Sequence, residues 1–342
     1  MNNSKINIQY PMHVGPWGGG NQFLKALKVA LQNMNVYEES PEKSDIVLFN
    51  SFDSLGNITA IKKNNPDILF VHRVDGPISL IRGHGKIYDK KIFSINHAVA
   101  DGTIFQSEWS KNKLQEMGMP RNKFETVIHN AVDTAVFFPK DTPNKNKKIK
   151  LVAVSWSNNI NKGFDDYEYL DKHLDFDKYE MTFVGRSPVI FSNIKMIDPV
   201  SSDELAGMLR SHDIYITASK HDPCSNSLIE AMACGLPAVA YNDGGHTELV
   251  GNNGELFSHQ SELIEKINLV ALDMGKYKKG VNEQESIDAV AKKYYNFMSG
   301  IYRANQNKNY TAKKLARLYW LRQISFWFLE QLFRVRLKLS NK

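Results

Sequence analysis

The chain has 342 residues, of which 42% are hydrophobic, and this is enough for two domains that each bury a core. The net charge of +6 is unevenly placed: residues 303–342 hold ten lysine and arginine residues and one acid, which leaves residues 1–302 at −3. The body therefore lacks the basic surface of a nucleic-acid-binding protein, and no nucleic-acid partner is expected. Cys224 and Cys234 are the only cysteines, so no disulfide framework is indicated.

Short apolar segments alternate with helical patterns, which is typical of parallel sheets flanked by helices. Residues 139–150 are rich in Pro, Asn and Lys and are interpreted as a linker. The sequence thus predicts an α/β protein with Rossmann-like domains at residues 1–140 and 148–300 and a tail at 303–342. The predicted strands are residues 6–10, 45–50, 67–71, 92–95 and 102–106 in the first series, and 149–155, 181–184, 213–217 and 237–241 in the second.

Three consecutive glycines, Gly18, Gly19 and Gly20, follow the first predicted strand and precede a predicted helix. Glycine lets the backbone approach a ligand closely, so this turn is a candidate to line a binding cleft. The run matches neither GxGxxG nor a Walker sequence, and a tight strand-to-helix turn is an equal alternative.

A second candidate edge follows the apolar strand in LFVHRVDGP, residues 69–77. His72, Arg73 and Asp75 come at its carboxyl end, where ligands of open α/β sheets bind. Asp75 is a candidate ligand contact, and Arg73 is expected to pair with it. For His72 the alternative is a structural role, which is the more frequent one for a histidine at a strand end.

The most informative segment is DPCSNSLIEAMACGLPAVAYNDGGHTELV, residues 222–250. Its Asp-Pro and Ser-Asn-Ser clusters are typical of a helix start, and the apolar helix that follows is expected to stop at Gly235. Free backbone N–H groups at such a start suit a phosphate, helped by the positive end of the helix dipole. The candidate residues of this segment are Asp222, Ser225, Asn226, Ser227, Glu230, Gly244 and Gly245.

This segment resembles the nucleotide-sugar site of the family-four retaining glycosyltransferases, or group 1, which have the GT-B fold. The resemblance rests on an acid, seven intervening residues, the sequence EAMACGLP and a following Gly-Gly-x-x-Glu-Leu-Val. A further match is VIHNAVDTAVFFP, residues 127–139, which resembles the family's exit from its first domain. The resemblance implies two Rossmann-like domains that face each other across a cleft.

The resemblance also implies roles for individual residues. Asp222, where the family usually has Glu, and His72 would orient the transferred sugar, and Glu230 would bind the ribose. The glycine pair at 244–245 would lie beneath the phosphates and sugar. Asp75 would contact the sugar or the acceptor.

Lys162 matches the family's lysine that neutralises the donor diphosphate, whereas a solvated lysine at a helix start is the alternative. A fixed cation and helix-terminal amides stabilise the charge that the leaving group gains, so neither a metal nor another cofactor is expected. The family's partner arginine is absent from residues 155–158. Arg186 or Lys220 would have to supply the missing charge.

The function implied by the resemblance is a retaining glycosyltransferase of the hexosyltransferase type. It would move a sugar from a nucleoside diphosphate sugar to a glycan or lipid-linked saccharide, in the biosynthesis of surface polysaccharide or lipopolysaccharide. The alternative is a catalytically weak GT-B-like scaffold that binds a partner enzyme or the membrane through its tail.

The tail at residues 311–339 has apolar residues at helical spacing together with basic and aromatic residues, a pattern that suits a helix lying on anionic lipid. A helix packed on the enzyme or on a partner chain is the alternative. The N-terminus has no apolar signal region and no run reaches a membrane span, so we expect a cytoplasmic protein, peripheral on the inner face of the membrane. The apolar stripe comprises Leu321, Ile324, Phe328, Leu332, Val335 and Leu339.

Overall fold

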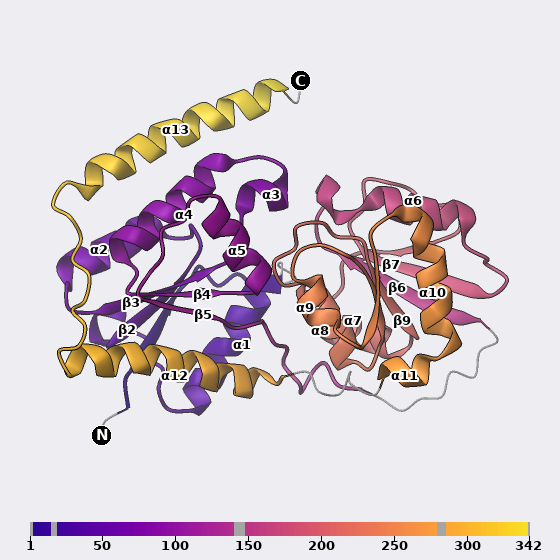
Figure 1. The fold of residues 1–342 in the computed structure, drawn as a ribbon, viewed down its shortest axis with the longest axis horizontal. Coiled ribbons are helices and arrows are strands. Elements are labelled where there is room, and N and C mark those ends of the chain that lie inside the picture. Colours follow the sequence, from indigo (N-terminus) through magenta and orange to yellow (C-terminus); the bar gives the residue numbers. More distant parts are fainter. Residues whose placement is uncertain (1–2, 15–18, 140–147, 279–284, 341–342) are drawn as a thin grey trace. The chain divides into compact units, whose positions relative to one another are not determined.

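The structure is a computed structural model that describes residues 3–14, 19–139, 148–278 and 285–340 (Figure 1). The chain divides into two compact units, and each contains one parallel sheet with helices packed against it. This confirms the predicted α/β architecture with two Rossmann-like halves. The first unit comprises Met1–Pro11, Lys28–Ile128 and Ala291–Lys342, and the second comprises Met12–Leu27 and His129–Val290.

The first sheet has five parallel strands in the order β1-β2-β3-β4-β5. Its central strands are buried on both faces, so their sequences are almost continuously apolar, as in Val47 to Phe49 and in Leu69 to Val71. The strands are β1 (Ile6–Gln9), β2 (Ile46–Asn50), β3 (Leu69–Val74), β4 (Gly102–Phe105) and β5 (Phe124–Val127).

One predicted strand of this unit is wrong, because residues 92–95 lie in the helix α4 (Lys86–Val99). Ile92, Ile95 and Val99 are completely buried, and their spacing of three and four residues is that of one helix face. The other helices of or entering this unit are α1 (Gly19–Asn33), η1 (Pro41–Lys43), α2 (Leu55–Asn64), α3 (Ile78–Arg82), α5 (Glu108–Glu116), α12 (Ile287–Gln306) and α13 (Tyr319–Ser340).

The chain re-enters the first unit within α12, so the boundary lies at Ala291 and not at residue 300 as expected from the sequence. The reason is packing: Ser299 on α12 hydrogen-bonds Ser4 at 2.7 Å, and Ile301 lies against Gly102. A Cβ on Gly102 would come within 2.5 Å of Ile301 Cδ1, so glycine lets α12 approach β4 closely.

The second sheet has six parallel strands in the order β11-β10-β9-β6-β7-β8. Numbered by appearance within the unit this order is 6-5-4-1-2-3, which is a doubly wound sheet with β6 and β9 side by side at its centre. The strands are β6 (Ile149–Ser155), β7 (Tyr179–Gly185), β8 (Lys195–Ile197), β9 (Ile214–Thr217), β10 (Ala238–Tyr241) and β11 (Gly254–Phe257).

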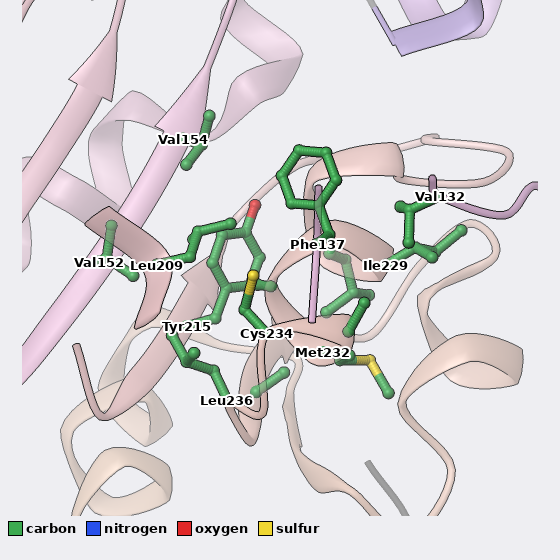
Figure 2. Close-up of a cluster of buried hydrophobic side chains, with 14 of the residues drawn as sticks. Val132, Phe137, Val152, Val154, Leu209, Tyr215, Ile229, Met232, Cys234 and Leu236 are labelled. Atoms are coloured by element: carbon green, nitrogen blue, oxygen red, sulfur yellow. The ribbon is translucent and has the colours of Figure 1, made fainter. Parts of the chain in front are cut away.

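The core on one face of this sheet is formed by side chains of β6, β9, α7 and α8, as Figure 2 shows for Val152, Tyr215, Leu209 and Ile229. These four side chains are at most 2% exposed, so α8 is held rigidly against the sheet. The helices are η2 (Ile160–Lys162), α6 (Phe164–His173), α7 (Ser202–Arg210), α8 (Asn226–Ala233), α9 (His246–Val250), η3 (Gln260–Glu262), α10 (Leu263–Leu272) and α11 (Met274–Lys278).

The expected C-terminal amphipathic helix is confirmed as α13, which runs along α4 on the outside of the first unit (Figure 1). None of the helices in the described part of the chain combines the length and apolar character needed to cross a membrane.

Candidate functional site

The second unit has its topological switch point between β6 and β9, because the chain winds away from these two strands in opposite directions. Doubly wound sheets bind ligands in the crevice that this leaves at the carboxyl ends of the strands. A pocket of about 210 Å³ lies at this place. Its lining residues are Gly19, Val154, Ser155, Trp156, Ser157, Lys162, Asp222, Cys224, Ser225, Asn226, Ser227 and Glu230.

Lys162 and Asp222 form an ion pair in this pocket, with Lys162 Nζ 3.2 Å from Asp222 Oδ2. Lys162 is the last residue of η2, whose first turn is capped by the Asn159 side chain. Gly163 follows with a φ of +73°, and a Cβ there would lie 2.2 Å from the carbonyl oxygen of Ala218. The loop is therefore pinned against the end of β9, and only glycine fits at its closest point.

The backbone of Asp222 is positioned by Gly244 and Gly245, the glycine pair named from the sequence. Gly244 has a φ of +67°, and a Cβ on it would lie 2.2 Å from the Asp222 carbonyl oxygen. Gly245 N–H donates to the same oxygen at 2.8 Å. Burial pulls the pKa of the Asp222 carboxyl upward, but the Lys162 ammonium and then His246 bring it below its ordinary value. Asp222 is thus a carboxylate at neutral pH.

The start of α8 presents unused backbone donors to the pocket. The N–H groups of Asn226, Ser227 and Leu228 have no hydrogen-bond acceptor among the residues that the structure describes. Ser225, the residue before the helix, is buried, and Tyr215 fixes the Ser227 hydroxyl with a hydrogen bond of 2.8 Å. Together with the helix dipole, these donors form an anion site beside the Lys162 ammonium.

Glu230 lies one turn further along α8, and no described residue hydrogen-bonds its carboxylate. Burial without a compensating partner raises the pKa of Glu230 to about 8. At neutral pH this carboxyl group is therefore protonated, and its carbonyl oxygen, which has no donor among the described residues, can accept a hydrogen bond from a ligand hydroxyl.

A second pocket of about 490 Å³ adjoins the first and shares Gly19, Trp156 and Glu230 with it. Its other wall is residues 199–205, at the start of α7, where Ser201 and Glu204 form a capping box. Sequence reasoning missed this wall. The capping-box pattern after a short strand was its only local signal, and that pattern predicts a helix start but no ligand.

The side chains of Arg186 and Lys220, the candidates to replace the absent arginine, line neither of the two pockets. Arg186 follows β7 and is exposed, and its N–H donates to Ser155, but its side chain does not line either pocket. Lys220 stacks on the ring of Tyr241 at 5.1 Å. Among the residues described, Lys162 is the only cation that lines the 210 Å³ pocket.

The three consecutive glycines at the first strand-to-helix turn differ in what the structure shows for each of them. Gly18 lies outside the described residues. Gly19 begins α1 and lines both pockets, and a Cβ on it would lie 2.3 Å from Asn226 Nδ2. Gly20 has open space where a Cβ would be. Of the two described glycines only Gly19 makes a close approach, which is to Asn226, and contact of this turn with a ligand remains a prediction.

In the first unit, Asp75 belongs to a polar cluster at the carboxyl edge of the sheet. Its carboxylate accepts hydrogen bonds from Arg73 Nη1 at 2.6 Å and from Asn50 Nδ2 at 2.8 Å. Gln106 Nε2 donates to it at 2.7 Å. The side chain nevertheless remains 31% exposed, whereas Arg73 is completely buried. Asp75 is therefore fixed in position and still accessible to a ligand.

The structure contradicts the expectation that His72 reaches a sugar. His72 is completely buried and stacks on Phe49 with ring centroids 4.2 Å apart. Its Nε2 lies 2.8 Å from the Ser51 carbonyl oxygen, and its Nδ1 lies 3.1 Å from Asn96 Nδ2. Burial lowers the pKa of His72 to about 3, so the ring is neutral, donates to Ser51 and accepts from Asn96. Both nitrogens serve the fold.

Within the four described ranges, no group of three or more His, Cys, Asp or Glu side chains is placed to hold a metal ion. The expectation that the protein needs no metal or other cofactor remains a prediction.

Comparison with known proteins places this site in a family context. Residues 190–319 match the model of the family described as glycosyl transferases group 1. A probable sucrose-phosphate synthase of Thermosipho melanesiensis is 28% identical over 199 residues, which are 50% of this chain and 46% of that protein. The chain spans about half the length of the curated relatives it matches.

Solved structures show the same fold. The sucrose-phosphate synthase from Thermosynechococcus elongatus has a TM-score of 0.72 at 14% identity, with 89% of this chain and 100% of that chain covered. Anabaena HepE, solved with UDP and glucose, has a TM-score of 0.69 at 15% identity, with coverages of 87% and 100%. The GT-B fold and the resemblance to group 1 glycosyltransferases are thereby confirmed.

Proposed function

We propose that this protein is a retaining glycosyltransferase that moves a hexose from a nucleoside diphosphate sugar to a glycan or lipid-linked saccharide. The observation that carries the proposal is the convergence of three features on one pocket at the switch point. These are the unused N–H groups at the start of α8, the Lys162 ammonium and the uncommitted carboxyl of Glu230. Backbone donors and a cation suit the phosphates of a nucleoside diphosphate, and an acceptor suits the hydroxyl groups of its ribose.

The two pockets suggest how the donor would lie. The diphosphate would occupy the 210 Å³ pocket between Lys162 and α8, and the ribose hydroxyls would donate to Glu230. The base would enter the 490 Å³ pocket, where Trp156 offers an aromatic face and residues 199–205 offer backbone groups. Uridine is the first base to test, because HepE, which shares the fold, was solved with UDP and glucose.

In the proposed transfer reaction, Lys162 and Asp222 would act on different parts of the donor. As the bond between the anomeric carbon and the phosphate oxygen breaks, negative charge grows on the leaving diphosphate, and Lys162 and the α8 amides stabilise it. Asp222 would hold a hydroxyl of the sugar. The acceptor hydroxyl would form the new bond on the face that the leaving group vacates, and a departing phosphate oxygen would take its proton. The anomeric configuration would be retained.

The first unit would contact the sugar or the acceptor through Asp75, which is fixed by three donors and still accessible. Assembly of a surface polysaccharide or lipopolysaccharide is the proposed setting. A lipid-linked acceptor would place the enzyme at the inner face of a membrane.

Calorimetric titration with UDP, GDP, dTDP and ADP, followed by turnover of the matching glucose donor, tests this proposal. We expect one diphosphate to bind without added metal and to bind about 10- to 100-fold more weakly to Lys162→Ala. Lys172→Ala, which changes an exposed lysine on α6, is the matched control and should bind as the wild type does. A folded protein that binds none of the diphosphates would contradict the proposal and favour the catalytically weak scaffold.

A further inference from the structure

One face of the helix α13 packs against the first unit. Tyr319 hydrogen-bonds Ser94 at 3.2 Å, and Gln323 donates to Thr59 at 2.8 Å. These contacts join the first turns of α13 to α4 and α2.

Further along the same face, Glu330 forms an ion pair with Lys91, and the ring of Phe333 meets the edge of Tyr88 with centroids 6.1 Å apart. The anchoring residues recur at intervals of four, seven and three, which places them on one side of a helix. The docking is specific, because it uses a partly buried ion pair and two hydrogen bonds besides apolar packing.

The opposite face of α13 is apolar and uncovered. Successive residues of a helix are about 100° apart, so the centre of the stripe at Ile324, Phe328 and Val335 lies about 150° from the anchors Tyr319 and Glu330. The large apolar side chains of this face are between 45% and 67% exposed. They are Trp320, Leu321, Ile324, Trp327, Phe328, Leu332, Val335 and Leu339.

Such a continuous apolar surface is rare on a monomeric protein and marks a site that another surface covers. In the second unit the most exposed apolar residues stand far apart along the chain, as Leu272 and Ile190 do. The stripe on α13 is therefore a feature of this helix and not of the surface in general.

Charge decides which surface covers the stripe. By helical position, Arg322 and Arg336 lie beyond one border of the stripe and Lys338 lies at the other, where Arg334 forms an ion pair with Glu330. The single acid of residues 303–342 is Glu330, which is 9% exposed and forms ion pairs with Lys91 and Arg334. The outward side of α13 thus combines apolar and positively charged groups, with tryptophans among them.

A basic hollow lies at the first turn of α13. This pocket of about 820 Å³ is lined by Lys63, Lys314, Arg317 and Trp320 among others. Three exposed cations next to the beginning of the apolar stripe suit the phosphate of a lipid headgroup.

We propose that α13 docks the first unit on an anionic membrane, with the stripe in the acyl boundary and the flanking arginines and the basic hollow at the headgroups. This inference deepens the proposed function and rests on it for its biological sense, because a lipid-linked acceptor is met at that surface. The helix differs from a free amphipathic anchor because the face opposite the stripe already packs against the protein. Membrane contact would therefore fix the orientation of the first unit.

Vesicle flotation of the full chain is the test. The probes are vesicles of phosphatidylcholine alone and of phosphatidylcholine mixed with phosphatidylglycerol. We expect binding to the mixed vesicles that weakens with salt, and a blue shift of tryptophan emission. Leu332→Glu with Val335→Glu should reduce binding about tenfold or more, because two charges would enter the acyl boundary. Leu272→Glu, which changes an exposed leucine of α10, is the matched control and should bind as the wild type does.

A second variant separates charge from apolar insertion. Lys314→Gln with Arg317→Gln should weaken binding to the mixed vesicles alone, whereas Lys172→Gln with Lys195→Gln in the second unit should not. Unchanged melting temperatures show that the variants fold. Equal binding to both vesicle types, or binding that the stripe variant leaves unchanged, would overturn the inference. So would a dimer in light scattering that the stripe variant dissociates, because a second copy would then cover the stripe.

The two proposals can fail separately. UDP titration reports on the pocket of the second unit, and the stripe variants should keep the wild-type affinity for the nucleotide. Vesicle binding without nucleotide binding would leave the membrane inference standing and remove the proposed function, and the reverse result would do the opposite.

Discussion

The ammonium of Lys162 lies 3.2 Å from the carboxylate of Asp222, and this pair closes one side of the pocket at the ends of β6 and β9. Each partner is positioned by a glycine with positive φ, Gly163 at +73° and Gly244 at +67°. A diphosphate that attracts Lys162 would weaken this pair and leave Asp222 available to a sugar hydroxyl. The two parts of a nucleotide sugar would then be recognised by the two halves of one ion pair.

The first prediction concerns Lys162, the only cation among the described residues that line the 210 Å³ pocket. Lys162→Met should lower kcat/KM for the donor about 10- to 100-fold, because the growing charge of the leaving group loses its partner. Steady-state kinetics measures this change. Arg186→Met is the informative comparison, since its side chain lies outside both pockets and its loss should leave kcat/KM near the wild-type value. A larger effect at Arg186 would contradict the assignment.

Asp222→Asn should separate nucleotide binding from sugar transfer. Removal of a negative charge beside the phosphate site should leave UDP affinity equal or slightly higher, whereas turnover of UDP-glucose should fall about tenfold or more. Calorimetry and product formation are the two measurements. Asp243→Asn changes a neighbouring carboxylate that pairs with His221 and should preserve turnover. A parallel fall in UDP affinity and melting temperature in Asp222→Asn would show that Asp222 serves only the fold.

Glu230→Gln should change how stability depends on pH. The pKa of Glu230 is raised to about 8 by burial, so between the ordinary value of 4.5 and that value the folded chain holds a proton that the unfolded chain has released. The stability of the wild type therefore falls as pH rises through this range. The glutamine variant lacks this loss, so its melting temperature should exceed the wild-type value increasingly toward pH 8. A difference in melting temperature between variant and wild type that stays constant from pH 5 to pH 8 would contradict the raised pKa of Glu230.

The candidate residues that the structure brings together around Asp222 are mostly encoded in one local segment. Asp222, the start of α8 and the Gly244–Gly245 pair fall within one segment, and Gly244 has the positive φ that favours glycine, whereas Ser225 makes no side-chain cap hydrogen bond at the start of α8. Lys162 was named from the resemblance to the family, and the structure places it directly before Gly163 and in the same pocket as Asp222.

The errors arose where long-range packing decides the outcome. Residues 92–95 form too short an apolar run to separate helix from strand, and packing of one helical face against side chains of the sheet selects α4. His72 stands at a strand end in sequence, but Phe49 and Asn96, which enclose it, come from distant elements. The anchors of α13 are also distant, because Glu330 meets Lys91 and Gln323 meets Thr59.

Gly244→Ala should have two effects: it should destabilise the protein, and it should displace Asp222. The φ of +67° is unfavourable for alanine, and its Cβ would lie 2.2 Å from the Asp222 carbonyl oxygen, so the loop must shift. We expect a loss of about 1–3 kcal/mol in unfolding free energy and weaker transfer. Gly207→Ala on α7, where a Cβ meets nothing within 4 Å, is the control and should be neutral or slightly stabilising. Equal effects of the two changes in chemical denaturation would contradict the role of Gly244.

His72→Phe tests whether this histidine acts on a substrate or on the fold. Phenylalanine keeps a ring against Phe49 but leaves the Ser51 carbonyl and the Asn96 amide without their bonds to the imidazole, so about 1–3 kcal/mol of stability should be lost at neutral pH. Donor KM and kcat of the folded variant should stay near the wild-type values.

The pH dependence of the His72→Phe effect has a definite sign. The pKa of His72 is lowered to about 3 in the folded chain from an ordinary 6.5, so the unfolded chain binds an extra proton between these values. Wild-type stability from this group is complete above pH 6.5 and is lost as the pH falls toward 3. The variant lacks that loss, so its deficit in unfolding free energy should shrink as the pH falls from 7 to 5. Denaturant titrations at several pH values measure this, and a deficit that grows in acid, or a large fall in kcat, would restore His72 to a catalytic role.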